Sequence, residues 1–199
     1  MEMKGEQLVP ASQQDVWNAL NDPAMLKACV PGCESIEPAG ENTYQVLMVA
    51  RVGPVSAKFK GKLTLSDIRA PQSYSIAFEG QGGAAGFAKG GAQVSLSPDG
   101  TNTKLSYDVK ANVGGKLAQI GSRLVDAAAR KVADDFFRNF NEKVAALHED
   151  KTHAVEHEEH HAEPVPRDAD LPTISNTTLC FFAAGALVVF VVALLTLLS

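Results

Sequence analysis

The feature that most constrains how this chain folds is a change of hydrophobic period near residue 115. Between Thr43 and Asn112, five runs alternate apolar and polar residues between turn signals, which is typical of half-buried β-strands. From Gly115 to about Leu147 the apolar residues instead recur every three or four positions, which is the period of an amphipathic helix. The short connections between the strands predict an antiparallel meander. We therefore expect an α+β fold, in which a curved antiparallel sheet wraps around one long C-terminal helix.

The first thirty residues predict one strand and two short helices before the meander. Ser12 is suited to cap a helix whose apolar stripe stops before Pro23, and a second helix is expected from about Pro23 to Cys29. The expected strands cover residues 3–9, 43–52, 56–68, 73–80, 87–97 and 104–112. The apolar stripe of the long helix consists of Leu117, Ile120, Leu124, Ala128, Val132, Phe136, Phe140, Val144 and Leu147.

The alternation also predicts which strand residues face the helix, and several of them are small. This inward set consists of Tyr44, Val46, Met48, Phe59, Gly61, Leu63, Leu65, Tyr74, Ile76, Phe78, Gly80, Ala88, Gly90, Ala92, Val94, Leu96, Leu105, Tyr107, Val109 and Ala111. Its Gly and Ala residues, facing the alanines at 127–129 of the helix, supply too little volume for a close-packed interior. The deficit predicts an apolar cavity. A closer approach of the helix to the sheet is the alternative that periodicity leaves open.

Composition divides the chain into three regions. Residues 1–147 are expected to form one domain, and its sixteen basic and fifteen acidic residues argue against a nucleic-acid partner. Residues 148–178 hold all five histidines, eight acidic residues and two basic ones, and are expected to be a disordered linker. Residues 179–199 form an uncharged apolar run of the length of one transmembrane helix. Because the N-terminus has no apolar leader, we expect a single-pass C-terminal anchor with the domain facing the cytoplasm.

The residue types present in the domain favour binding over catalysis. Residues 1–147 contain no histidine, which excludes a Ser-His-Asp triad or a Cys-His pair within the domain. Cys29 and Cys33 have no matching second pair, so no metal site is predicted, and a redox disulfide is the alternative to two partly buried structural thiols. The histidines at 153, 157 and 161 are interpreted as part of a solvated spacer, with weak metal binding or a pH response as the alternatives.

Several short motifs in the first 147 residues resemble one family. They are Pro10-Ala11-Ser12 with Val16-Trp17, the segment from Cys29 to Glu34, Gly53-Pro54-Val55, Phe59-Lys60-Gly61, the helix opening from Gly114 to Gly121, and the segment from Phe136 to Phe140. Together they resemble the family of the carbon monoxide dehydrogenase G subunit. That family belongs to the helix-grip superfamily of START-like (SRPBCC) domains.

The resemblance implies a deep hydrophobic pocket between the sheet and the long helix. It also implies an accessory, non-catalytic role beside a carbon monoxide dehydrogenase-type molybdenum hydroxylase at the cytoplasmic membrane, where the protein would contact membrane lipid and link the enzyme to the electron transport chain. No tightly bound cofactor is expected, and a respiratory isoprenoid quinone is the suspected pocket ligand. A ligand-free recruitment anchor, a lipid-transfer domain and a cyclase-like enzyme are the alternatives. The residues expected to line the pocket are Trp17, Leu26, Met48, Phe59, Phe78, Phe87, Tyr107, Leu124, Ala128, Val132 and Phe136.

Overall fold

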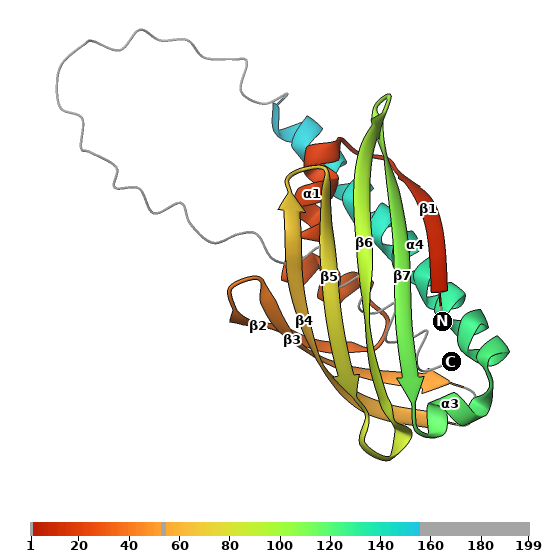
Figure 1. The fold of residues 1–199 in the computed structure, drawn as a ribbon. Helices are drawn as coiled ribbons and strands as arrows, with labels where there is room; N and C mark the ends of the chain where they lie inside the picture. Colours follow the sequence, from red (N-terminus) through yellow and green to blue (C-terminus); the bar gives the residue numbers. More distant parts are fainter. Residues whose placement is uncertain (1, 53–54, 156–199) are drawn as a thin grey trace, which may run out of the picture.

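The computed structural model describes residues 2–52 and 55–155, apart from the side chains of residues 52, 55, 117, 120, 122, 125, 126, 128 and 148–155. In this part of the chain seven antiparallel strands form one sheet, in the order β1-β7-β6-β5-β4-β3-β2. The elements are β1 (Glu2–Val9), α1 (Gln13–Leu20), α2 (Pro23–Cys29), β2 (Cys33–Gly40), β3 (Thr43–Val52), β4 (Val55–Arg69), β5 (Ser73–Gln81), the 3-10 turn η1 (Gly83–Ala85), β6 (Phe87–Asp99), β7 (Asn102–Gly114), α3 (Lys116–Ile120) and α4 (Ser122–Val155). The sheet curves around α4, with α1 and α3 at opposite ends (Figure 1). The expected α+β architecture is confirmed.

Alternation in the sequence locates the inner face of the sheet correctly. All six expected strands are present within a few residues of their expected bounds. Every member of the inward set is buried except Gly90 and Tyr107, which are partly buried. The core therefore lies between this face and α4, because one buried face imposes a period of two on each strand.

β2 is a strand that the sequence pattern does not predict. It forms the outer edge of the sheet, pairs only with β3, and is interrupted by irregular register near Cys33 and near Pro38. Its residues are partly or fully exposed on both sides, so no alternation develops. An edge strand tolerates proline and exposure because one of its sides has no neighbouring strand.

Local capping fixes where α1 and α2 begin. The Ser12 hydroxyl accepts a hydrogen bond from the Asp15 backbone N–H (3.2 Å) and donates one to the Asp15 carboxylate (2.6 Å). Asp22 caps α2 by accepting from the Ala24 N–H at 2.8 Å, with Pro23 in the first turn. The Asn139 side chain of α4 then donates to the Cys29 carbonyl at the end of α2 (3.0 Å). The bond from Asn139 holds α2 against α4 at one end of the core.

The long helix is broken near its start, so the expectation of one continuous helix from Gly115 is wrong at this point. Gly121 separates α3 from α4 with φ of +99° and ψ of 138°. A residue at positive φ cannot continue the right-handed helix, and glycine adopts that region without a steric cost. At its other end α4 continues past residue 147 to Val155, and no proline or glycine occurs there to stop it before Pro164.

The face that α4 buries is rotated from the expected apolar stripe. The buried residues are Ala129, Ala133, Phe136, Phe137, Phe140 and Val144, whereas Leu124 is 57% exposed. Each step of four residues turns about 40° around a helix axis, so three steps back from Phe136 to Leu124 turn about 120°. The stripe read at steps of four therefore leaves the buried face towards the start of α4.

The predicted anchor at 179–199 and most of the predicted linker lie outside the described residues. Within the described part, no helix is both long enough and apolar enough to cross a membrane. The sequence-based expectations for residues 156–199 stay predictions.

Candidate functional site

On the inner face of the sheet, aromatic rings lie over glycines. A Cβ atom at Gly90 would lie 2.6 Å from Cζ of Phe78, and a Cβ atom at Gly82 would collide with the ring of Phe59. Gly5 of β1 lies in the same way under the ring of Tyr107. The rings occupy the volume that the missing side chains leave, which keeps the interior close-packed at these three positions.

Aromatic contacts tie the sheet to the helices in two groups. The Trp17 ring of α1 meets Tyr74 of β5 edge-on, with ring centroids 5.5 Å apart. Tyr107 of β7 stacks on Phe137 of α4 at 5.7 Å, and Phe136 contacts Phe137 and Phe140 at 5.2 and 5.4 Å. Such pairs add roughly 0.5–1.5 kcal/mol each beyond the area they bury. The Tyr107–Phe137 stack fixes the middle of α4 against β7, and the Trp17–Tyr74 pair fixes α1 against β5.

The structure places the predicted pocket residues at three depths. Trp17, Leu26, Met48, Phe59, Phe78 and Phe136 are buried in the core. Tyr107 and Val132 are partly buried and pack against that core. Phe87 is 48% exposed and Leu124 is 57% exposed, and the side chain of Ala128 is outside the described set.

Phe87 lies on the outer face of the sheet. It alternates with the buried Ala88, and its ring covers Gly114 of β7, where a Cβ atom would collide with it. The inward set already contains Ala88, so the period of two was a signal that its neighbour Phe87 points the other way.

The connection between β5 and β6 closes against the start of α3. A Cβ atom at Gly115 would lie 2.5 Å from Cα of Gly86, and both residues have positive φ. Glycine at both positions lets the two backbones touch. Ala85 of η1 is buried beside this contact, which closes the end of the core next to α3.

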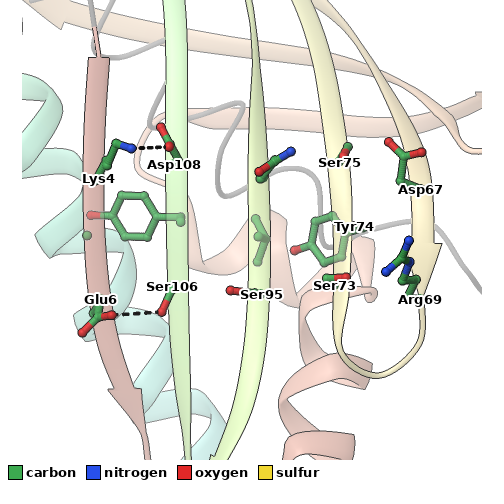
Figure 2. A pocket seen from close by; sticks show the side chains of 14 residues that line it. Lys4, Glu6, Asp67, Arg69, Ser73, Tyr74, Ser75, Ser95, Ser106 and Asp108 are labelled. Atoms are coloured by element: carbon green, nitrogen blue, oxygen red, sulfur yellow. Dashed lines mark hydrogen bonds and ion pairs between the residues drawn. The ribbon is translucent and has the colours of Figure 1, made fainter.

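A polar groove of about 740 Å³ runs across the outer face, and the sequence pattern does not predict it. Two rows of side chains from five strands line it (Figure 2). In one row the strand register aligns Glu6, Ser106, Ser95, Ser73 and Arg69, and in the other it aligns Lys4, Asp108, Gln93 and Ser75. The available signal was the polar half of the alternation, which normally marks only a solvated face.

Ion pairs organise the β1 side of this groove. Lys4 Nζ lies 2.6 Å from Asp108 Oδ2, and the hydrogen bond raises the pKa of the lysine. Lys104 lies 2.9 Å from Glu6 and lowers the pKa of that carboxyl, which also accepts a hydrogen bond from Ser106 (3.3 Å). The second oxygen of Asp108 is buried without a partner in the described part of the chain. The groove can therefore offer hydroxyl, amide and carboxylate groups to a polar ligand.

The two cysteines of the domain are protonated, free thiols. Cys29 is fully buried and Cys33 partly buried, and burial raises the pKa of each thiol to about 11. Their sulfur atoms have separate partners, Met25 Sδ and the Ser35 carbonyl, each at 3.8 Å. Within the described residues, no three His, Cys, Asp or Glu side chains are placed to hold a metal ion. The structure fits the interpretation of structural thiols.

Comparisons with known proteins relate the chain to one family and one fold. Residues 5–145 match the family model of the carbon monoxide dehydrogenase G subunit (CoxG). A conserved protein from Geobacillus kaustophilus has a similar crystal structure, with 31% identity and a TM-score of 0.70 over 73% of this chain and 96% of that one. TTHA0849 from Thermus thermophilus (17% identity, TM-score 0.56, 74% of this chain and 99% of that one) and Ara h 8.0201 (14%, 0.53, 73% and 98%) share the fold. No curated protein gives a match.

Proposed function

Because the chain belongs to the family of the carbon monoxide dehydrogenase G subunit, we propose that it is an accessory protein that recruits a carbon monoxide dehydrogenase-type molybdenum hydroxylase to the cytoplasmic membrane. In this proposal the domain binds a respiratory quinone, and residues 179–199 anchor it in the bilayer. The family match carries the proposal, since it extends over residues 5–145 and so over nearly all of the helix-grip domain.

The residues proposed for the quinone turn around α4 from its solvent-exposed side at Leu124 to its buried side at Phe136. Leu124 is 57% exposed, Val132 is partly buried and Phe136 is fully buried. An isoprenoid tail is apolar, so it gains free energy at each step along such a path. This path is the entry route that we propose.

The glycines under the aromatic rings supply the room at the end of this route. Rotation of the Phe59 and Phe78 rings away from Gly82 and Gly90 would uncover glycines, which have no side chain of their own. The apolar inner face around them then provides a mostly hydrophobic site with few polar groups, as is usual for pockets that bind small molecules. In this proposal the tail replaces the rings, so the site is filled both with and without ligand.

Identifying the bound molecule tests the quinone part directly. The full-length protein is extracted from membranes in mild detergent, and bound lipids are measured by mass spectrometry. Trp17 is the one tryptophan of the chain and is buried against Tyr74, so added quinone should quench its emission saturably. If no quinone copurifies and none quenches Trp17, quinone binding is refuted.

Two substitutions that add the same side-chain volume test whether the quinone site lies on the inner face of the sheet. Ala88 lies on the inner face opposite Gly80, whereas Ala77 of β5 is exposed on the outer face. Ala88→Leu should abolish quinone quenching and Ala77→Leu should leave it unchanged. Thermal unfolding of both variants, followed by Trp17 emission, separates a blocked site from an unfolded domain. Equal quinone affinity in the two folded variants would place the ligand elsewhere.

A ligand-free recruitment anchor is the second candidate, and the rings over Gly5, Gly82 and Gly90 favour it. They show that the inner face is packed at these positions without any ligand. The two candidates differ in one outcome. A recruitment anchor still brings the dehydrogenase down with membranes while neither mass spectrometry nor Trp17 quenching detects a quinone. In both candidates removal of residues 179–199 lowers the share of the dehydrogenase in the membrane fraction.

A further inference from the structure

The outer face of the sheet carries a cluster of lysines at the end near the β5–β6 turn. Lys58, Lys60 and Lys62 alternate along β4 and therefore project from the same face, and Lys89 projects from β6. All four are exposed. Lys58 pairs with Glu34 at 2.6 Å, but no ion pair joins Lys60, Lys62 or Lys89 to a carboxylate among the described residues. We call these four residues the lysine face.

The strand register places the exposed ring of Phe87 among these lysines. Lys60 is aligned with Gln81, and Gln81 with Phe87, so Lys60 and Phe87 are two strands apart in one row, about 10 Å. The next row aligns Lys62, Glu79 and Lys89 in the same way. Phe87 is 48% exposed. A half-exposed phenylalanine is thus bordered by ammonium groups along its own strand and across the sheet.

Two adjoining grooves lie between these side chains. One, of about 680 Å³, is lined by Lys58, Lys60 and Lys62 over glycine backbone at Gly61 and Gly80. Its neighbour, of about 430 Å³, shares Lys62 and Glu79 and adds Lys89. Glu79 is the one carboxylate among the lining residues of the two grooves. The ammonium groups therefore surround hollows in which positive charge exceeds negative charge.

We propose that the lysine face docks the domain on an anionic phospholipid surface, with the ammonium groups on the lipid phosphates and Phe87 inserted at the interface. Lysine is depleted at protein–protein interfaces, which favours lipid over a protein partner. Clustered lysines beside an exposed aromatic side chain are typical of membrane-surface binding. The proposal goes beyond the proposed function, because it gives the folded domain a membrane contact of its own. It holds whether or not the domain binds a quinone.

The test uses the full-length chain reconstituted into vesicles. In a Phe87→Trp variant, lipids with brominated acyl chains should quench the new tryptophan in vesicles of phosphatidylcholine with phosphatidylglycerol, but not in phosphatidylcholine alone. The unsubstituted chain supplies the background, since Trp17 is buried. Each lysine near an anionic surface is expected to favour docking about fivefold. Adding K60Q, K62Q and K89Q together should therefore lower the ratio of docked to undocked domain roughly 100-fold.

A control with the same loss of charge removes three exposed lysines that already have carboxylate partners. These are Lys4, Lys104 and Lys131, paired with Asp108, Glu6 and Asp135. The K4Q/K104Q/K131Q control should keep the lipid quenching. Thermal unfolding of both triple variants shows that the domain remains folded, as expected for exposed substitutions.

Three results would overturn the proposal. The first is equal quenching in neutral and anionic vesicles, and the second is quenching that the lysine-face variant leaves intact. The third is a lysine-face variant that keeps its lipid quenching but no longer brings the dehydrogenase to the vesicles, which would assign the face to a protein partner. Quinone content, measured on the same samples, is independent of all three and reports separately on the proposed function.

Discussion

Replacing Gly90 by alanine is expected to destabilise the domain by about 2–3 kcal/mol. The added Cβ would lie 2.6 Å from Cζ of Phe78 and 2.8 Å from Cα of Ala111, and would collide with the carbonyl oxygen of Lys110. Phe78 is 4% exposed, and displacing its ring with no ligand to take its place would leave a cavity. The other two contacts are backbone atoms of β7, which is paired with β6 along its length. Overpacking typically costs about 1–3 kcal/mol, and the backbone contacts place this substitution at the upper end.

Gly91→Ala is the matched control. It lies one residue along β6 on the outer face, where its Cβ would meet a single atom, the Ile76 carbonyl oxygen, at 3.1 Å. Its cost should stay within about 1 kcal/mol, because a smaller entropy of the unfolded chain offsets part of the crowding.

Urea denaturation of the full-length protein, followed by Trp17 emission, measures both free energies of unfolding. In a thermal scan of the same variants, a difference of about 2 kcal/mol corresponds to roughly 4–8 °C in the unfolding temperature of a domain of this size. If Gly90→Ala is as stable as Gly91→Ala, there is open space above Gly90 and Phe78 does not fill it.

Three further substitutions or conditions test other parts of the structure. Thr103→Val should cost about 1–3 kcal/mol in urea denaturation, because the fully buried hydroxyl donates to the Ala11 carbonyl at 2.7 Å and valine would leave that acceptor unpaired; an unchanged midpoint would contradict this. Gly121→Ala should cost about 1–3 kcal/mol in calorimetry, since φ of +99° is strained for alanine; a more stable variant would show that the break between α3 and α4 is not required. Burial raises the pKa of the Cys29 and Cys33 thiols to about 11, so few of them are thiolates at pH 8. Iodoacetamide should therefore alkylate these cysteines in the folded protein about 100-fold more slowly than a free thiol of ordinary pKa. Because these pKa values are raised in the folded state, the stability from the neutral thiols is present below pH 9 and is lost as pH rises towards 11, and rapid alkylation at pH 8 would refute the burial argument.

The sequence predicted the sheet well because burial of one face forces a period of two on each strand. β3 has the bounds that the alternation of Thr43–Val52 predicts, and β5 begins at Ser73 as expected. β2 was not predicted because neither of its faces is fully buried, so its residues need not alternate between apolar and polar. The break at Gly121 was not predicted for a different reason. A single glycine within an apolar helical pattern has the same sequence signature whether its φ is negative or positive.

The candidate site was harder to predict, because an apolar pocket has no polar residues that mark it. The small inner residues were recognised, but whether the space above them is empty depends on where neighbouring rings point. Phe78 and Phe59 fill that space from adjoining strands, a relation that only strand register and side-chain rotamers determine. The error in the helix stripe is geometric, since a fixed step of four drifts around the axis and takes Leu124 off the buried face. The outer groove and the lysine face arise from rows of residues across strands, which are far apart in the sequence.

The proposed quinone route and the proposed lipid-docking surface adjoin the same end of the domain. Phe87 follows Gly86, whose backbone contacts Gly115 just before α3, and Leu124 lies in the first turn of α4 just after α3. If the lysine face rests on lipid, the path from Leu124 through Val132 to Phe136 begins at the end of the domain near Phe87, although α4 lies on the opposite face of the sheet from the lysines. A quinone tail that leaves the lipid beside Phe87 then has to pass only around α3 to reach the inner face, whereas a domain docked by its α1 end would place the start of this path farthest from the lipid. The cost of exposing that apolar tail, about 25 cal/mol for each Å², makes the orientation of the domain decisive for ligand exchange.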